Sequence, residues 1–467
     1  MTAGEGGRAY DGLPVVVAGA GVSGAAAARV LRELGARVTV AVADEQRAEA
    51  LAADGFEVRP LDAPQAGTAL VVTSPGWRPD SPLLVAAAGA GLEVIGEVEL
   101  AWRLRPEDAA PWLAVTGTNG KTTTVRMLAA VLSSAGLRTV AAGNVGLPLL
   151  DAVHGDCDVL AVELSSFQLH WSSTVRPHTA VVLNVAPDHV DWHGSLDAYA
   201  ADKGRIHAPG TVAVYNREDA ESVRLAAAGL ERGAAARAGF TLGSPAAGEL
   251  GVVEDLLVDR AFAHRPSGDV PGEGTVLATL ADIGVPGGHN VANALAAAAL
   301  TRSYGVPASA GRDGLRAFAP DPHRNALVGE HDGVAWVDDS KATNPHAAAA
   351  SLAAYPSVVW IAGGLLKGAD VDDLVRTAAP GLRGVVVLGT DRAPFLDALR
   401  RHAPDLPVEV VDRLDTGAMS DAVARARRLA RPGDTVLLAP AAASMDCFRD
   451  YRERGELFAA AVREAAA

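Results

Sequence analysis

The stretch Thr116–Thr123, which reads TGTNGKTT, has the residue types of a loop that binds phosphate groups. No glycine stands five residues before Gly120, so the usual G-x-x-x-x-G-K-[ST] pattern is incomplete. The loop nevertheless follows the apolar stretch WLAV and precedes a helix that we expect to start at about Thr123, whose positive end attracts phosphate. Lys121 can neutralise the β- and γ-phosphates of a nucleotide, and the Thr122 hydroxyl can reach Mg²⁺. The spacing therefore predicts a site for a nucleoside triphosphate.

A carboxylate and an imidazole follow apolar stretches in the same part of the chain. Glu163 ends DVLAVE, and His189 follows TAVVLNVAPD. Because the carboxyl ends of parallel strands meet at one edge of a sheet, we expect both side chains to lie beside Lys121. A cation could bind there; oxygen ligands favour Mg²⁺, and a histidine ligand is less usual for it. Taken singly, Glu163 is equally well explained by a cap or a salt bridge, and His189 is better explained as a structural histidine. Their joint placement favours ligation.

The stretch Gly19–Gly24, which reads GAGVSG, has the glycine spacing of a dinucleotide-binding turn. It follows an apolar strand, opens a helix that ends at Gly35, and is followed by Asp44 where a ribose-binding acid would stand. Alone, this motif predicts a nicotinamide-dependent dehydrogenase. The pyrophosphate of any nucleotide fits such a turn, however, UDP as well as NAD, and a dehydrogenase would leave the Lys121 loop without a role.

Apolar strands and helical stretches alternate along most of the chain, which predicts an α/β protein whose parallel sheets are covered by helices. We expect three domains: a Rossmann-like N-terminal domain over 1–98, a central P-loop ATPase-like domain with a parallel sheet over 99–320, and a C-terminal Rossmann-like domain over 321–467. Between residues 239 and 282, short strands with many glycines and prolines predict a small appended sheet.

Composition narrows the function classes. With 467 residues, 49% hydrophobic and 21% charged, the chain has the balance of a soluble globular protein of several domains. A net charge of -15 argues against a nucleic-acid partner. The uncharged run Ala347–Leu366 is interrupted by Pro356 and Gly363, so it predicts helix, turn and strand instead of a membrane span. Cys157 and Cys447 have no metal-binding spacing, and buried thiols in a cytoplasmic protein are expected.

Several motifs together resemble the Mur ligases, from about Gly19 to Tyr451: TGTNGKTTT, GNVGLP, VELSSFQL, NVAPDHVDWHGS, GGHNVANALAA, PHR, VDDSKATNPHAA and SPG. DSKATN together with APAAASMDCFRDY narrows the resemblance to the members that add D-glutamate. In this family the phosphate loop reads T-G-T-N-G-K-[ST], which accounts for the missing glycine. The resemblance implies an ATP-dependent ligase of peptidoglycan synthesis that acts on UDP-N-acetylmuramoyl-L-alanine and D-glutamate, and we expect a monomer. The substrate carboxylate would take the γ-phosphoryl group of ATP, and the D-glutamate amine would then displace phosphate.

The resemblance also implies which residues hold ATP and two Mg²⁺ ions. Thr122 and Glu163 would bind one ion and His189 the other. Lys203 matches the lysine that the family carboxylates on Nζ, and the resulting anion could bridge toward both ions where an ammonium would repel them. From its spacing alone, Lys203 would be a solvated helix lysine. The expected catalytic residues are Lys121, Glu163, His189 and Lys203. The expected ATP-binding residues are Gly117, Thr118, Asn119, Gly120, Lys121, Thr122, Thr123, Asn290, Arg324, Asp339 and Lys341.

The resemblance also implies which residues bind the two other substrates. The expected D-glutamate-binding residues supply cationic and hydroxyl donors for carboxylates, and they are Thr343, Lys367, Ser444 and Tyr451. The expected UDP-substrate-binding residues are Gly21, Val22, Ser23, Asp44, Ser74, Asn144 and Gln168. Two positions depart from the family pattern. Ala326 stands where a glutamate commonly follows Arg324, and Leu365-Leu366 replaces a polar residue before Lys367. These departures concern the ribose and D-glutamate contacts and leave the metal and phosphate ligands in place.

Other functions share part of this pattern. A ligase that adds another amino acid, or a folylpolyglutamate synthase, shares the central motifs and is the second interpretation. The dehydrogenase is the third, and an ATP-binding regulator without catalysis is the fourth. Because the nucleotide, metal and amino-acid residues fall in different predicted domains, we also expect the domains to close when substrates bind.

Overall fold

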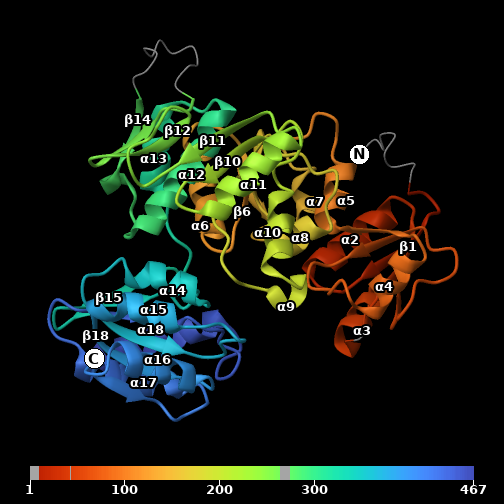
Figure 1. The fold of residues 1–467 in the computed structure, drawn as a ribbon. Helices are drawn as coiled ribbons and strands as arrows, with labels where there is room; N and C mark the ends of the chain where they lie inside the picture. The colour runs from red at the N-terminus through yellow and green to blue at the C-terminus, as the bar shows by residue number, and fades with distance from the viewer. Residues whose placement is uncertain (1–9, 43, 263–273, 467) are drawn as a thin grey trace. The chain divides into compact units, whose positions relative to one another are not determined.

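The computed structural model describes residues 10–42, 44–262 and 274–466. Over these residues the chain is a mixed α/β protein with three sheets, which confirms the predicted fold class (Figure 1).

The first sheet is parallel, with the strand order β3-β2-β1-β4-β5. Alternate residues of its middle strand, PVVVA, face different core clusters. Val15 and Val17 belong to one cluster, whereas Val16 and Ala18 belong to another. A strand buried on both faces is continuously apolar, as this one is. The strands are β1 (Pro14–Ala18), β2 (Arg37–Ala41), β3 (Glu57–Arg59), β4 (Leu70–Thr73) and β5 (Glu93–Gly96). The helices are α2 (Val22–Glu33), α3 (Glu45–Ala53), α4 (Pro82–Gly89) and α5 (Glu97–Leu104).

The second sheet has nine strands in the order β14-β13-β12-β11-β10-β9-β6-β8-β7. Its strands are β6 (Trp112–Thr116), β7 (Thr139–Gly143), β8 (Val159–Glu163), β9 (Thr179–Val182), β10 (Val212–Asn216), β11 (Ala236–Phe240), β12 (Glu249–Val253), β13 (Leu256–Asp259) and β14 (Thr275–Thr279). The predicted small appended sheet is wrong, because β11 pairs in parallel with both β10 and β12. The short strands β12, β13 and β14 therefore extend the central sheet, with β13 antiparallel to both neighbours.

Helices lie between most of the strands up to β11 and after β14, as alternation of strand and helix in the sequence predicts. They are α6 (Lys121–Ser134), α7 (Leu149–Ala152), α8 (Ser166–His170), α9 (Val190–His193), α10 (Leu196–Gly204), α11 (Ala220–Glu231), η1 (Leu280–Asp282), α12 (Gly288–Tyr304) and α13 (Ala308–Ala317).

The third sheet has the order β15-β16-β20-β17-β18-β19 and is parallel except for the hairpin of β15 and β16. Its strands are β15 (Ala326–His331), β16 (Val334–Asp338), β17 (Val358–Gly363), β18 (Leu382–Leu388), β19 (Val408–Val410) and β20 (Thr435–Leu438). Its helices are α14 (Pro345–Leu352), α15 (Asp372–Ala378), η2 (Ala379–Gly381), α16 (Arg392–His402), α17 (Ala418–Leu429) and α18 (Tyr451–Ala466). The uncharged run 347–366 thus forms the end of α14, a turn, and β17.

The chain divides into two compact units. The first two sheets belong to one unit, which ends at Ala317; the third sheet belongs to the other, which resumes at Phe318 and also takes in Ala186–Asp188 and Ile283–Val291. Residue 98 lies inside α5, whose buried face joins the same core cluster as β1 and β8. The boundaries after residues 98 and 320 stay predictions.

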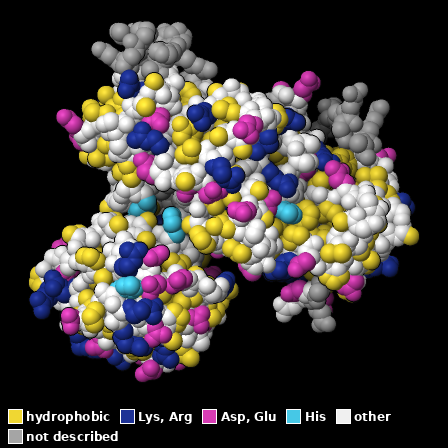
Figure 2. Space-filling model, viewed as in Figure 1, with side chains coloured by type: hydrophobic (Ala, Val, Ile, Leu, Met, Phe, Trp, Pro, Cys, Tyr) yellow, Lys and Arg dark blue, Asp and Glu magenta, His cyan; other side chains and the backbone are white. Residues whose placement is uncertain are grey.

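Charged side chains of both signs are interspersed over the face of the molecule that Figure 2 shows. Within the described ranges, none of the helices combines the length and the apolar character that crossing a membrane requires.

Candidate active site

The phosphate loop connects β6 to α6 through Gly117–Gly120, and the helix begins at Lys121, slightly earlier than predicted. Gly120 caps the helix in the left-handed region, with φ of 84°. A Cβ atom on Gly120 would lie 2.5 Å from the side-chain oxygen of Asn293. Glycine is therefore required here both by the backbone conformation and by the close approach of α12. Thr122 and Thr123 lie half-buried in the first turn of α6.

The backbone of this loop is fixed by Asn184, which follows β9. The Thr118 N–H donates to the Asn184 carbonyl at 2.9 Å, and the Asn119 N–H donates to Asn184 Oδ1 at 2.9 Å. Asn184 Nδ2 in turn donates to the Asn119 carbonyl at 3.2 Å. Lys121 Nζ donates to the carbonyls of Gly117 and Thr118, both at 2.9 Å. The lysine charge is thus held directly over the turn of the loop.

Glu163 lies beside this loop, because it ends β8 and pairs with Val115 of β6. The side chain is buried, at 1% exposure. Oε1 accepts a hydrogen bond from Asn144 Nδ2 at 2.7 Å, whereas the buried Oε2 has no hydrogen-bond partner among the described residues. An unpartnered carboxylate oxygen in a buried position is costly unless a cation or donor satisfies it. The oxygen donor set therefore fits a hard divalent cation such as Mg²⁺.

Lys203 is buried in the same place, at 1% exposure, so the sequence-based description of it as a solvated lysine is wrong. It projects from α10, and its Nζ donates to the Gly117 carbonyl at 2.8 Å. Nζ also lies 4.4 Å from the ring centroid of Tyr199, whose hydroxyl is 3.0 Å from Thr118 Oγ1. The lysine and its helix thus contact the phosphate loop directly.

His189 is the cap residue of α9 and has a positive φ of 52°. Its ring centroid lies 4.8 Å from that of Phe167 and 6.4 Å from that of Tyr199. The structure therefore brings Lys121, Glu163 and Lys203 to one edge of the central sheet. Tyr199 contacts both His189 and Thr118.

The residues predicted to hold the UDP substrate lie mainly at the carboxyl ends of β1, β2 and β4. A Cβ atom on Gly24 would lie 2.0 Å from the Gly19 carbonyl, so the glycine turn needs glycine for close packing. Ser74 donates its N–H to Ala18, and its buried Oγ has no partner among the described residues. Asp44 is exposed and caps α3 by accepting from the Arg47 N–H at 2.9 Å. Gly21, Val22 and Ser23 form the cap and the first turn of α2.

Asn144 and Gln168, which the sequence assigned to the substrate, make protein contacts within the first compact unit. The Asn144 amide holds Glu163, as described above. Gln168 is buried and completes a capping box at the start of α8, where its Oε1 accepts from the Ser165 N–H at 2.9 Å. Both side chains therefore shape the segments around Glu163.

In the second compact unit, Asp339 follows β16 and is surrounded by donors. It accepts from the Ser351 hydroxyl and from the Asn325 N–H. Burial raises the pKa of Asp339 to about 6, although these hydrogen bonds and the charge of Arg324 act in the opposite direction. Asn290, in the same unit, donates its side-chain amide to the Pro286 carbonyl at 2.7 Å.

The loops predicted to bind D-glutamate meet at the carboxyl edge of the third sheet. The Ala441 N–H donates to the Ala342 carbonyl at 2.9 Å, and Leu365 and Ala443 exchange two backbone hydrogen bonds. Lys341 Nζ lies 3.9 Å from the ring centroid of Tyr451. Thr343 is half-buried, Ser444 is buried, and Lys367 is exposed with a positive φ of 53°. The loops that carry these residues are therefore brought together.

Comparisons with known proteins agree with this geometry. The sequence profile of the Mur ligase middle domain matches residues 115–301, and that of the Mur ligase, glutamate ligase domain matches residues 323–442. The chain belongs to the Mur ligase family.

Among its relatives, the UDP-N-acetylmuramoylalanine–D-glutamate ligase of Streptomyces avermitilis is 60% identical over 466 residues, which cover 97% of this chain and 98% of that protein. The enzyme of the same name from Thermobifida fusca is 60% identical over 464 residues, with the same coverage. A solved structure of the UDP-N-acetylmuramate-alanine ligase from Thermotoga maritima matches with a TM-score of 0.57 and 19% identity, over 97% of this chain and 99% of that one. The last similarity concerns the fold.

Several residues that build this Mur ligase site were missed by the sequence analysis. Asn184 and Tyr199 hold the phosphate loop, and Asn293 contacts Gly120 and accepts from Thr124 Oγ1 at 3.2 Å. A signal was available for Asn293, because its spacing of three from Asn290 places both on one helix face.

Arg454 was also missed, although its side chain is fully buried in the second compact unit. Its guanidinium donates to Ser340 Oγ, to the Ser340 carbonyl and to the Ala442 carbonyl at 2.8 to 3.1 Å. Burial lowers the pKa of Arg454 to about 10. Arg454 therefore joins the loop of Lys341 to the loop of Ser444. Nothing in the sequence around Arg454 indicates that it is buried.

Proposed function

We propose that this Mur ligase catalyses the ATP-dependent ligation of D-glutamate to UDP-N-acetylmuramoyl-L-alanine, a step of peptidoglycan synthesis, and forms ADP and phosphate. The observation that carries a ligase reaction is the meeting of Lys121, Glu163 and Lys203 at the phosphate loop. The choice of substrates is supported by the name of the relatives that are 60% identical over 97% of the chain.

Two Mg²⁺ ions would be held by Thr122, Glu163, His189 and a carboxylated Lys203. The unpartnered Oε2 of Glu163 supports this proposal. Carboxylation of Lys203 Nζ would replace a cation by an anion at a position that already contacts the phosphate loop. The metal ions would neutralise the charge of the phosphate groups.

In the first step a carboxylate oxygen of the UDP substrate bonds to the γ-phosphorus, while the bond to the bridging oxygen of ADP breaks. The product of this step is an acyl phosphate. Such a transfer depends on positioning and on charge neutralisation more than on covalent help from the protein. The phosphate loop Gly117–Gly120, the positive N-terminal end of α6 and the charge of Lys121 would supply both, with Asn290, Arg324 and Asp339 holding the nucleoside.

In the second step the neutral amine of D-glutamate bonds to the acyl carbon, the bond to phosphate breaks, and the nitrogen loses a proton. The D-glutamate carboxylates and the phosphate would be held by Lys341, Thr343, Lys367, Ser444 and Tyr451. Cationic and hydroxyl donors suit carboxylates, and the meeting of their loops supports this assignment.

The UDP group would lie at the carboxyl ends of β1, β2 and β4. The residues proposed to contact it are Gly21, Val22, Ser23, Asp44 and Ser74, with Asn144 and Gln168 toward its sugar and alanine.

The test is phosphate release by the full chain with ATP, Mg²⁺ and defined substrates. We expect release only when both UDP-N-acetylmuramoyl-L-alanine and D-glutamate are present. Release with L-lysine or diaminopimelate in place of D-glutamate would assign the chain to a different Mur ligase reaction. Replacement Lys203→Ala should abolish release, and added short carboxylic acids should restore part of it if an anion is what the position supplies. Full activity of Lys203→Ala would overturn the role of a carboxylated lysine.

A further inference from the structure

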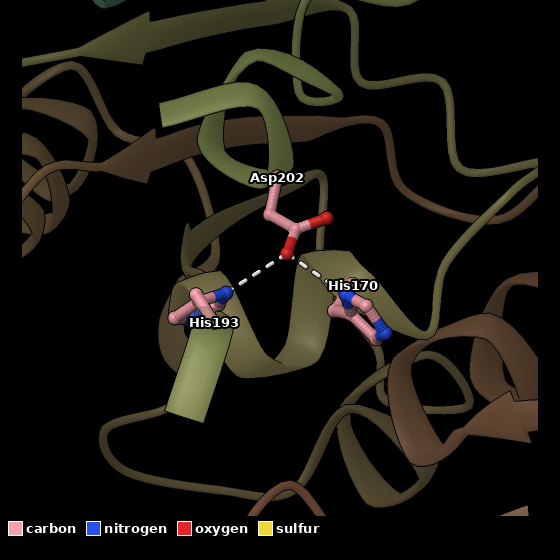
Figure 3. Close-up of side chains that lie close together, drawn as sticks. All are labelled: His170, His193 and Asp202. Carbon is pink, nitrogen blue, oxygen red and sulfur yellow. Dashed lines mark hydrogen bonds and ion pairs between the residues drawn. The ribbon is translucent and has the colours of Figure 1, made fainter. Parts of the chain in front are cut away.

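Asp202 lies between two histidines next to the proposed site (Figure 3). Its Oδ2 is 2.8 Å from His170 Nδ1 and 2.9 Å from His193 Nδ1, and its Oδ1 is 3.1 Å from Arg205 Nε. His193 Nε2 is 3.0 Å from Ser166 Oγ. We call His170, His193 and Asp202 the His–Asp–His cluster. None of its members was singled out by the sequence analysis.

The hydrogen bonds of this cluster are mutually consistent. Both Nδ1 atoms lie at hydrogen-bond distance from Oδ2 of Asp202, and Oδ1 faces the Arg205 guanidinium, so the carboxylate accepts from donors on both sides. His193 Nε2 lies at hydrogen-bond distance from the Ser166 hydroxyl. The ring of His193 is thereby fixed at both nitrogens, and its side chain is fully buried.

The three members sit on the three short helices that carry or follow the proposed metal ligands. His170 ends α8, which comes directly after Glu163 and its cap residue Ser165. His193 ends α9, the single turn that His189 caps. Asp202 precedes Lys203 in α10. The cluster thus ties together the segments on which the geometry of the site depends.

The ring of His193 also contacts the aromatic residues that surround the ligands. It is stacked on Phe167 with centroids 5.5 Å apart and an interplanar angle of 9°, and Phe167 contacts His189. On another side it lies 5.1 Å from Tyr199, which contacts Lys203, Thr118 and His189. A shift of His193 would therefore move both ring neighbours of His189.

We propose that the His–Asp–His cluster is a positioning device that fixes His189 and Lys203 relative to Glu163. In this proposal the cluster acts through the residues beside it. This inference rests on the proposed role of Glu163, His189 and Lys203 as metal ligands. Partners that orient metal ligands typically change metal affinity by about 10- to 100-fold when they are removed.

Metal binding by the cluster itself is the competing explanation, because its three ligand atoms lie within 4.8 Å of one another. The geometry favours positioning. The Nδ1 atom of each histidine already lies at hydrogen-bond distance from Asp202, and the Arg205 guanidinium lies against the same carboxylate. A cation placed among these groups would face that fixed positive charge.

The experiment measures Mn²⁺ binding to the full chain by electron paramagnetic resonance, with His193→Phe as the test variant. The phenyl ring keeps the aromatic packing and removes both hydrogen bonds. His402→Phe is the matched control, because it removes a similar contact, 2.8 Å to Asp372, in the other compact unit. We expect the Mn²⁺ Kd of His193→Phe to rise by at least about tenfold, and that of His402→Phe to stay at the wild-type value. Asp202→Asn, which keeps the side-chain shape, should act in the same direction and serves if His193→Phe does not fold.

Equal Mn²⁺ affinity in His193→Phe and His402→Phe would overturn the inference. So would stoichiometric zinc in the wild-type protein that is lost in His193→Phe, because the cluster would then be a metal site. Absence of any Mn²⁺ binding to the wild type would remove the proposed ligands and the inference with them. Failure of D-glutamate-dependent phosphate release, with Mn²⁺ binding intact and sensitive to His193, would count against the proposed reaction alone.

Discussion

The hydrogen bond from Asn144 to Glu163 offers a direct test of the metal site. Asn144→Ala removes a donor 2.7 Å from Oε1 of a carboxylate that is 1% exposed and whose Oε2 has no partner among the described residues. The variant therefore leaves the buried carboxylate without the only side-chain donor that the described residues offer it. We expect the carboxylate to lose its fixed orientation toward the phosphate loop.

The magnitude follows from the charge on the acceptor. A hydrogen bond to a charged group contributes about 1.5–3 kcal/mol. At about 1.4 kcal/mol for each factor of ten, this corresponds to roughly a 10- to 100-fold increase in the Mg²⁺ concentration needed for half-maximal activity. Excess Mg²⁺ should restore most of the rate, because the ligand itself is still present.

The assay is phosphate release against Mg²⁺ concentration at saturating ATP and substrates. Asn216→Ala is the control, because its side-chain amide donates to a backbone carbonyl, that of Leu183, at 3.0 Å in the same sheet. The reasoning is refuted if the Mg²⁺ requirement of Asn144→Ala stays within about twofold of the control while the KM for the UDP substrate rises. That result would mean that the amide binds the UDP substrate without orienting Glu163.

Three further predictions concern the loops and the core. Gly120→Ala should weaken ATP binding, measured by calorimetric titration, far more than Gly136→Ala does. Both glycines have positive φ, but only at Gly120 would a Cβ atom lie 2.5 Å from Asn293. Equal losses of affinity would show that backbone strain alone matters. Arg454→Lys should raise the KM for D-glutamate by about tenfold and the KM for ATP by less, since an ammonium cannot satisfy three divergent acceptors. An unchanged KM for D-glutamate would contradict the coupling of the loops of Lys341 and Ser444. Burial lowers the pKa of His207 from 6.5 to about 3, so its contribution to stability is complete above pH 6.5 and falls by up to about 1.4 kcal/mol per pH unit below it. His207→Leu should flatten the fall in thermal midpoint between pH 6.5 and 5.0, and a parallel fall in both proteins would exclude His207 as its source.

Much of the architecture could be predicted from local patterns. The stretch PVVVA is apolar at every position because β1 is buried on both faces. Gly24 is demanded by the close approach of the Gly19 carbonyl, and Gly19 and Gly120 by positive φ and nearby side chains. The family was also recognisable, because its motifs combine residue types at spacings that few other proteins share. The short strands were harder to place in a sheet. The segment 239–282 has no strong hydrophobic period, and the sheet that it joins depends on whether β11 has an open edge.

What the sequence determined by itself was therefore the identity of the loops that carry chemistry, since Lys121, Glu163 and His189 each follow an apolar strand and strand ends meet at one edge. Tertiary structure alone decided how those groups are held. Lys203 is buried against the Gly117 carbonyl, Asn144 orients Glu163, and the His–Asp–His cluster joins segments far apart in the chain. The physical reason is that burial and hydrogen bonding belong to pairs of segments, whereas periodicity and motif spacing belong to one segment at a time.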